Sequence, residues 1–354
     1  MRIEDKYRLE ARIGEGAQST VYTGISRRNG MTVAIKQIKP TPMLNEERDD
    51  IIPVSKLAAN YREIAILQRL REGGSHTNIV ELIEVVFDER TVFIVMNHCG
   101  MNLSEYILRR RSHCVDALFA PRPKSAACAS RPVVPLDEIK TIMWQVFSAL
   151  EFIHAQLVVH RDLKPQNIFV SKTQRGDLLV RVGDFGLAKA FTFPVAPETV
   201  NVASLWYRSP EVLLQTGYDL GCDLWPMGCI LAELASGTPL FIETCEFGLL
   251  MRIFQTLGTP DRDCWNVLER TSNFSLKWPK WNRQDCLPCL TIPMSRLLGD
   301  RGCDLLLALL AYESNDRLRA GEALSHSFFT VKGYVRLVEE ETGDLSDQLS
   351  DLSV

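Results

Sequence analysis

One short stretch of the chain, His160–Asn167, gathers the residue types from which a catalytic site could be built. It contains a carboxylate (Asp162), a cation two positions later (Lys164) and an amide five positions later (Asn167). A carboxylate can accept a proton from a hydroxyl, a cation can stabilise a developing negative charge, and an amide oxygen can bind a metal ion. Apolar runs on both sides predict strands, so the stretch is expected to be a loop that holds these side chains together. An ordinary polar turn is the alternative, but it would need neither this spacing nor the partners described next.

Three more polar residues stand where a predicted strand or helix can present them. Lys36 ends the run Val-Ala-Ile-Lys, Glu63 lies in a stretch with helical spacing, and Asp184 begins Asp-Phe-Gly after an apolar run. Near the N-terminus, Gly14 and Gly16 leave the backbone N–H groups of a turn open to an approaching phosphate. Phosphoryl transfer needs a triphosphate held in place, its charge offset by cations, and the acceptor hydroxyl aimed in line. Each residue alone could be a surface charge or part of a turn, but together they can supply these functions.

The first hundred residues predict a small sheet with one helix. Residues 7–36 alternate apolar and polar positions in three short runs, which predicts three antiparallel strands. Two more strands are expected at 79–87 and 91–96, and a helix at 57–71. The apolar stripe of that helix is predicted at Leu57, Tyr61, Ile64 and Leu67.

The composition becomes helical after residue 97, which places a domain boundary between residues 1–97 and residues 98–330. In the second domain, Asp223 is the expected N-cap of a helix, and Pro226 then falls in the first turn, where its missing N–H costs nothing. The helices expected there lie at 136–154, 223–236, 247–257, 304–312 and 320–325.

Two segments lack the pattern of a packed element. Residues 109–135 hold three consecutive arginines and four prolines, which predicts a flexible surface insertion; a basic docking patch for a partner is the alternative. Residues 331–354 contain two cations and six acids, so this tail accounts for the whole net charge of −4 and is expected to be mobile.

The bulk composition excludes several classes of protein. A net charge of −4 disfavours a dedicated nucleic-acid binder, and no apolar run approaches the roughly 18 residues that span a bilayer. No signal sequence opens the chain, so we expect a nuclear or cytoplasmic protein with reduced cysteines. The single C-x-x-C formed by Cys286 and Cys289 has no second pair or nearby histidine cluster to complete a zinc site.

From about Tyr7 to Phe329 the chain resembles a eukaryotic Ser/Thr protein kinase. The stretch His160–Asn167 is similar to the H-R-D-L-x-x-x-N catalytic loop of that family, and the other signatures occur in the family's order. The resemblance implies an α+β, two-lobed protein kinase fold, in which a small antiparallel sheet lobe with one main helix sits beside a larger, mostly helical lobe.

The same resemblance implies roles for individual residues in a site for ATP and Mg²⁺. Asp162 would accept the proton of the substrate hydroxyl, with Lys164 stabilising charge on the transferring group. Asn167 and Asp184 would bind Mg²⁺, while Lys36, held by Glu63, would pair with the nucleotide phosphates. The other nucleotide-site residues that it implies are Ile13, Gly14, Glu15, Gly16, Val21, Ala34, Met96, Asn97, Cys99 and Phe169, of which Met96 would guard the back of the adenine pocket, Asn97 to Cys99 form the hinge, and Phe169 lie beneath the base.

A later segment points to a subgroup. Residues 205–214, which contain Trp-Tyr-Arg-Ser-Pro-Glu, resemble cyclin-dependent kinases and their proline-directed relatives. In that group the arginine, here Arg208, helps to form a pocket for proline, which implies protein substrates with Ser-Pro or Thr-Pro sites. The family pattern also predicts that Arg317 pairs with Glu211 and braces the lower lobe.

The resemblance further implies regulation. Thr199 occupies the position of an activating phosphothreonine, whose charge could be gathered by Arg62, Arg161 and Lys189; an unmodified loop is the alternative. The helix at 57–63 is only loosely similar to the cyclin-facing helix of the group, so a cyclin-like activating subunit is expected without an identity.

The chain departs from the cyclin-dependent kinase motifs at a few positions, and other protein classes compete with this assignment. Ser19 replaces the third glycine of the phosphate-binding turn, and Ala17-Gln18 stand in place of an inhibitory Thr-Tyr pair. A mitogen-activated-type kinase is disfavoured because no tyrosine lies between Asp184 and Tyr207. A pseudokinase scaffold and a cyclin-independent proline-directed kinase stay as alternatives, although a pseudokinase typically lacks one of four residues that are all present here, namely Lys36, Asp162, Asn167 and Asp184.

Overall fold

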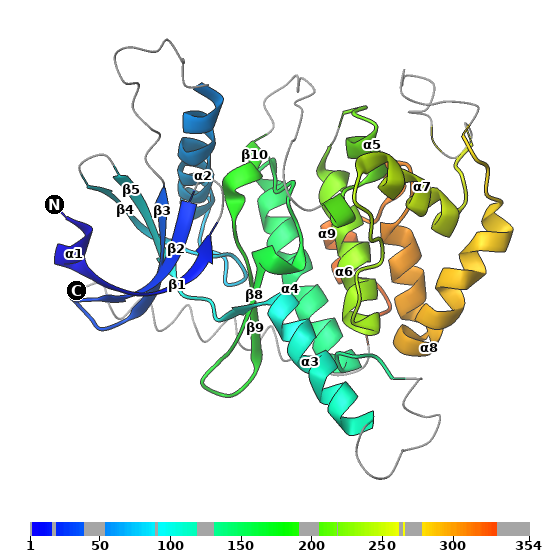
Figure 1. The fold of residues 1–354 in the computed structure, drawn as a ribbon, viewed down its shortest axis with the longest axis horizontal. Helices are drawn as coiled ribbons and strands as arrows, with labels where there is room; N and C mark the ends of the chain where they lie inside the picture. The colour runs from blue at the N-terminus through cyan, green and yellow to red at the C-terminus, as the bar shows by residue number, and fades with distance from the viewer. Residues whose placement is uncertain are drawn as a thin grey trace.

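The structure of the chain is a computed structural model with two lobes (Figure 1). It describes residues 2–15, 19–38, 54–88, 91–118, 131–190, 205–217, 219–261, 265 and 278–330, and the side chains of all of these except 54–60 and 113–118. The blue sheet with helix α2 forms one lobe, the cyan to orange helices form the other, and strands β8 and β9 lie between them. This arrangement confirms the two-lobed α+β fold.

The small lobe is built on a five-stranded antiparallel sheet in the order β1-β2-β3-β5-β4. The first three strands are those that alternation predicted. The fourth is shorter than expected, because Ile79 and Val80 pair with Val182 of the other lobe instead of continuing β4. The strands are β1 (Tyr7–Glu15), β2 (Ser19–Ser26), β3 (Thr32–Ile38), β4 (Leu82–Asp88) and β5 (Thr91–Asn97), and a short helix α1 (Ile3–Lys6) precedes them.

The two faces of this sheet have different tasks. Val33 and Ile35 of β3 are buried with Phe93 and Val95 of β5 in a small core of their own. Because side chains alternate along a strand, Lys36 projects from the opposite face, which packs on α2, and its Nζ contacts Asp184 of the other lobe. The register therefore aims Lys36 toward the second lobe.

Helix α2 (Val54–Glu72) confirms the predicted helix but not its stripe. Ile64 and Leu67 are buried as expected, whereas 52% of Tyr61 is exposed and Leu70 is buried. The buried face is set by contact with the sheet and with the segment after Asp184, so it runs toward the C-terminal end of the helix. The prediction that Tyr61 belongs to the core is wrong, and its ring is available to solvent.

The large lobe is organised around α4 (Leu136–Ala155), which buries one face, and α6 (Leu224–Ser236), which is almost entirely buried. The predicted helices within it are confirmed to within a few residues, with one exception. The remaining helices are α3 (Leu103–Leu118), α5 (Pro210–Leu213), α7 (Glu246–Leu257), α8 (Arg283–Leu309) and α9 (Ala320–Leu324). Short strands β6 (Met101–Asn102), β7 (Val158–Val159), β8 (Ile168–Lys172), β9 (Leu178–Val182) and β10 (Lys189–Ala190) carry the loops between the lobes.

Helix α8 is the exception, since it starts at Arg283 and the sequence predicted helix only from residue 304. Pro288, Pro293 and Gly299 interrupt the apolar pattern, and Gly299 has non-helical dihedrals (φ 73°, ψ 170°) that mark a kink. The pattern therefore revealed only the part of α8 after the kink.

The predicted insertion at 109–135 is wrong at both of its ends. Residues 109–118 continue α3, where Arg110 forms an ion pair with Glu138 of α4. At the other end Val134 is fully buried and its N–H donates to Leu234. The arginine run thus helps to attach α3 to α4, and residues 119–130 lie outside the described residues, as does the tail at 331–354. Among the helices that the structure describes, none has the length and apolar character of a membrane span.

Candidate active site

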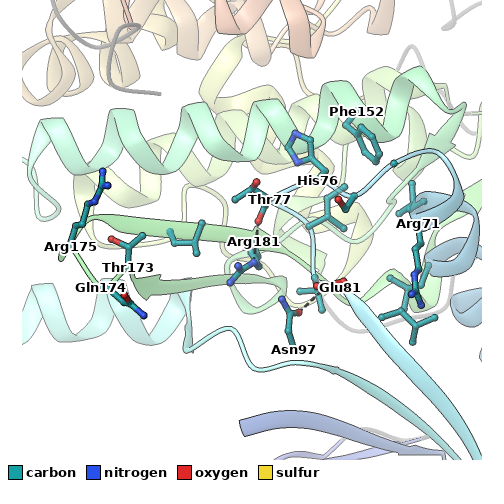
Figure 2. A pocket seen from close by; sticks show the side chains of 18 residues that line it. Arg71, His76, Thr77, Glu81, Asn97, Phe152, Thr173, Gln174, Arg175 and Arg181 are labelled. Carbon is teal, nitrogen blue, oxygen red and sulfur yellow. Dashed lines mark hydrogen bonds between the residues drawn. The ribbon is translucent and has the colours of Figure 1, made fainter. Parts of the chain in front are cut away.

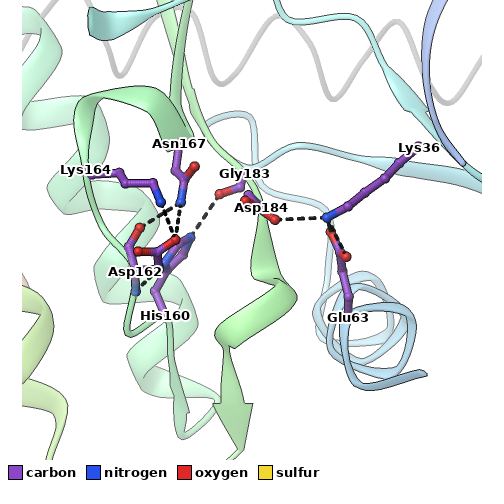
Figure 3. Close-up of polar contacts among 8 residues, drawn as sticks. All are labelled: Lys36, Glu63, His160, Asp162, Lys164, Asn167, Gly183 and Asp184. Atoms are coloured by element: carbon purple, nitrogen blue, oxygen red, sulfur yellow. Dashed lines mark hydrogen bonds and ion pairs between the residues drawn. The ribbon is translucent and has the colours of Figure 1, made fainter. Parts of the chain in front are cut away.

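The catalytic-type loop places its acid, cation and amide in direct contact (Figure 3). Lys164 Nζ lies 2.7 Å from Asp162 Oδ2. Asn167 Nδ2 donates to the same oxygen at 3.0 Å and to the Asp162 backbone carbonyl at 2.8 Å. A carboxylate held by a cation and an amide is fixed in orientation, and its side chain keeps 16% of its exposure toward a substrate.

A buried carboxylate from elsewhere in the chain fixes this loop. Asp223 Oδ2 accepts from the His160 N–H, and Asp223 Oδ1 accepts from the Arg161 N–H, each at 2.8 Å. The His154 ring lies 3.0 Å from the same carboxylate. Burial by itself would raise the pKa of Asp223, but the hydrogen bonds and charge of its partners outweigh it, and the pKa is lowered. Asp223 is therefore an anion that sets the backbone of the loop.

Sequence reasoning assigned Asp223 a different task. It stands at the N-cap position of α6, but its side chain makes no capping hydrogen bond. The only signal for its role in the sequence was a charged residue next to the apolar run of α6, which an N-cap explains equally well.

The loop backbone is strained where it meets the next segment. Arg161 has a φ of +65°, a left-handed conformation that a residue with a side chain rarely adopts outside functional sites. Its Nε donates to the Leu187 carbonyl at 2.7 Å, and His160 Nε2 lies 3.0 Å from the Gly183 carbonyl. The loop is thereby joined on both sides of Asp184, whose own φ is +59°.

The predicted pair of Lys36 and Glu63 is present, and Asp184 joins it (Figure 3). Lys36 Nζ lies 2.7 Å and 2.9 Å from the Glu63 oxygens and 2.9 Å from Asp184 Oδ1. Burial lowers the pKa of Lys36, but the two carboxylates outweigh that effect, so the pKa is raised and the ammonium keeps its charge. One cation from the sheet thus connects the helix of its own lobe to the other lobe.

Asn167 and Asp184 fit a binding site for a hard divalent cation. The pKa of Asp184 is lowered, because the charge of Lys36 outweighs the effect of burial, and 44% of the carboxylate side chain is exposed. Since Asn167 Nδ2 is directed at Asp162, its amide oxygen points away from that carboxylate, as Figure 3 shows. Two oxygen ligands with open coordination positions are the set that Mg²⁺ prefers.

The nucleotide-site residues of the sheet lie around Lys36. Val21 is opposite Lys36, Gly14 is opposite Val21, and Ala34 is opposite Met96. The register therefore places these residues together on one side of the lobe. Ile13 and Glu15 lie at the end of β1, where Ile13 is 52% exposed and Glu15 pairs with Arg12 at 2.7 Å. Gly16 lies outside the described residues.

The side chains of the predicted hinge residues and of Phe169 point in different directions. The Asn97 side chain accepts from the Glu81 N–H at 2.9 Å and so points away from Lys36, leaving its backbone to contribute to the hinge. Cys99 is buried, and burial raises the pKa of its thiol. The Phe169 ring lies against Gly183, directly before Asp184.

The predicted regulatory cations come from neighbouring elements. Arg62 lies on α2, while Lys189 of β10 pairs with Val159 just before Arg161. Helix α2 packs against β10, so the elements that carry the three residues are neighbours. Thr199 lies outside the described residues.

The segment at 205–214 is tied to helix α7 and to the residues that precede helix α9. Arg208 forms an ion pair with Glu246 of α7. The predicted pair of Arg317 and Glu211 is confirmed, with two hydrogen bonds of 2.7 Å between the guanidinium and the carboxylate. The Arg317 side chain has no exposure and stacks over Trp225.

Comparison with known proteins agrees with this geometry. Residues 7–329 match the protein kinase domain family. The chain is 35% identical over 334 residues to "Cell division control protein 2 homolog 1" of Trypanosoma brucei brucei, covering 92% of this chain and 99% of that protein. It is 33% identical over 330 residues to "Cyclin-dependent kinase 2" of Caenorhabditis elegans, covering 92% and 78%.

The family match spans both lobes, and the two relatives are similar over most of the chain. The residues that the site brings together are those expected of an enzyme that uses ATP to phosphorylate proteins. The chain belongs to the protein kinase family and is a Ser/Thr protein kinase of the cyclin-dependent-kinase-like group.

Proposed function

We propose that this kinase transfers the γ-phosphate of MgATP to Ser or Thr followed by Pro, and that a cyclin-like subunit activates it. The observation that carries the proposal is the contact of Lys36 with both Glu63 and Asp184, beside an Asp162 that is held by Lys164. A cation for the phosphates and a base for the hydroxyl are then present in one site.

Each residue has a defined task in this reaction. Lys36 holds the nucleotide phosphates, and Glu63 keeps its ammonium in place. Asp162 orients the substrate hydroxyl and accepts its proton, while Lys164 offsets charge on the group in transfer. Asn167 and Asp184 would hold Mg²⁺, which supplies charge neutralisation on the phosphates when bound.

Replacement of Asp162 tests the enzyme assignment. In Asp162→Asn the proton acceptor is lost but the phosphate and metal ligands stay, so we expect transfer to fall by at least about 100-fold while nucleotide affinity changes little. Transfer is measured with labelled ATP and a protein substrate, and nucleotide affinity by calorimetry with MgATP. Substantial residual transfer would contradict the role of Asp162, and a parent chain that binds MgATP without transfer would favour the pseudokinase.

Proline selection is supported by the resemblance of 205–214 to the proline-directed group and by the position of Arg208 next to Ser209 and Pro210. We expect a peptide with Ser-Pro to have a higher kcat/KM than the same peptide with Ser-Ala. In Arg208→Ala the ratio should fall toward one. Equal kcat/KM values for the two peptides in the parent chain would remove this part of the proposal.

A cyclin-like partner is supported by the outward face of α2, where Tyr61 is exposed on the helix that carries Glu63. Coexpression with a panel of cyclins is expected to raise activity, and Tyr61→Glu to abolish the increase. Gln68→Glu is the matched control, since Gln68 is also exposed on α2. Full activity without any partner would favour the cyclin-independent alternative. We further propose that the kinase acts in the nucleus or cytoplasm.

A further inference from the structure

A pocket of about 660 Å³ lies behind the hinge, apart from the catalytic residues (Figure 2). Its walls come from the end of α2, the segment at 74–82, the α4 helix and the hairpin of β8 and β9. The side chain of Asn97 lines it, but Lys36, Asp162 and Asp184 do not. The pocket is therefore a second site on the enzyme, with its own chemistry.

The inner surface of the pocket is largely apolar. Leu67 and Leu70 contribute from α2, Ile79 and Leu179 from the segments that join the lobes, and Phe152 from α4. The Phe152 ring packs on His76 at a centroid distance of 5.0 Å. An apolar surface of this kind favours a ligand with several aliphatic or aromatic side chains.

The rim of the pocket is cationic. Arg71, Arg175 and Arg181 line it, against a single carboxylate, Glu81. Arg181 Nε donates to the Thr77 carbonyl at 3.1 Å, which fixes the position of one guanidinium. The fitting ligand therefore combines apolar residues with carboxylates.

The chain itself contains such a segment. Residues 331–354 have two cations and six acids, while the rest of the chain balances to zero. Within this tail, the mostly apolar residues 334–338 are followed directly by Glu339, Glu340 and Glu341. The order of apolar residues and then acids matches an apolar pocket with a cationic rim.

The tail starts beside α4, a helix that also contributes to the pocket. Phe329 packs on Phe147 of α4 with ring centroids 6.2 Å apart, and Phe152, five residues further along α4, lines the pocket. Five helical residues span about 8 Å. A segment of 24 residues can extend to about 80 Å, so reach does not prevent contact.

We propose that residues 331–354 dock into this pocket in the same molecule, with residues 334–338 on the apolar wall and Glu339–Glu341 at the arginine rim. The docked tail would connect the end of α2 to the β8–β9 hairpin, and so brace the helix that carries Glu63 from behind. The inference does not depend on the substrate or on the activating partner.

Hydrogen exchange of the full chain tests the docking. We expect the amides at 334–341 to exchange at least about 10-fold more slowly than in a synthetic peptide of residues 331–354. Arg71→Glu/Arg175→Glu should remove this protection. The matched control Arg28→Glu/Arg296→Glu, which makes the same charge change at two other exposed arginines, should retain it.

A charge exchange makes the test specific. Glu339→Lys/Glu341→Lys should also remove the protection, and combining it with Arg71→Glu/Arg175→Glu should restore most of it. If the arginine variant does not fold, Arg71→Gln/Arg175→Gln replaces it with the same expectation.

Three results would overturn the proposal. The first is exchange in the parent chain as fast as in the peptide. The second is protection that falls on dilution, which would mean docking between two copies. The third is a combined variant without restored protection, in which case the pocket would be open to an acidic peptide of another protein.

Discussion

Two buried carboxylates organise the active site, and they do so in different ways. Asp223 is completely buried and accepts from the backbone of the catalytic loop within its own lobe. Glu63 is 2% exposed and reaches Lys36 from α2, a helix attached to the small lobe. The first contact lies inside one packed unit, whereas the second depends on where a surface helix sits.

This difference separates what the fold fixes from what can be regulated. The geometry around Asp162 is set whenever the large lobe is folded. The contact of Lys36 with Glu63 forms only when α2 lies inward, as it does here. Withdrawal of one helix would switch the site off without unfolding it.

The largest expected effect concerns the framework of the large lobe. Glu211→Gln would leave the fully buried guanidinium of Arg317 without its charged partner. Breaking a buried ion pair in this way costs about 3–5 kcal/mol of the free energy of unfolding. Urea denaturation followed by fluorescence measures it, and a change below about 1 kcal/mol would show that this framework is not fixed by the pair.

The next effect concerns Asp223 and depends on pH. Asp223→Asn leaves fewer acceptors for the N–H groups of His160 and Arg161, so we expect a loss of about 3 kcal/mol near neutral pH. Because the pKa of Asp223 is lowered by folding, its contribution is complete above the unfolded pKa of about 3.9 and is lost as pH falls below that value.

The urea midpoints of parent and Asp223→Asn should therefore converge as the pH is lowered toward 3. A difference in midpoint that is the same at pH 7 and pH 3.5 would show that the charge of Asp223 is not responsible.

Glu63→Gln tests the contact that depends on the position of α2, the ion pair of Glu63 with Lys36. Lys36 keeps Asp184 as a partner, so stability should change little. Loss of one charged hydrogen bond, worth about 1.5–3 kcal/mol, predicts a fall in kcat/KM for ATP of about 10- to 150-fold. Steady-state kinetics measures it, with thermal unfolding as the control. A large loss of stability without a kinetic effect would place Glu63 in the fixed framework instead.

The smallest effect is expected at Ser209. Its hydroxyl is buried and has no hydrogen-bond partner among the residues that the structure describes. Ser209→Ala removes an unsatisfied polar group and should raise the free energy of unfolding by up to about 1 kcal/mol. Differential scanning calorimetry of the two proteins would detect the shift, and destabilisation would mean that the hydroxyl has a partner.

The site residues that could be predicted from the sequence are those that lie within one short loop or one strand. Asp162, Lys164 and Asn167 share one loop, and the alternation of β3 indicates where Lys36 lies. The role of Asp223 could not be predicted, because its partners lie 62 and 63 positions earlier in the chain. In the sequence, an acidic residue directly before a helix is equally well explained as an N-cap. A pairing at that distance becomes visible only when the fold is known.

For the fold too, local patterns were predictable and contacts between distant segments were not. Strand alternation gave the sheet of the small lobe, since one face of each strand meets one core. Tyr61 was misplaced because the buried face of α2 is decided by what packs on it. The arginines at 109–111 were misread as an insertion because Arg110 is held by Glu138, a residue on another helix.

The Asp223 contact also has a consequence for synthesis on the ribosome. The catalytic loop at residues 160–167 is made well before Asp223, and Arg317 follows Glu211 by 106 residues. A nascent chain that has not yet released residue 223 lacks the carboxylate that accepts from the Arg161 N–H, although the Leu187 carbonyl is already available to the Arg161 side chain. Catalytic competence must therefore arise late in translation, and the emerging small lobe is inactive until the other half of the chain has been made.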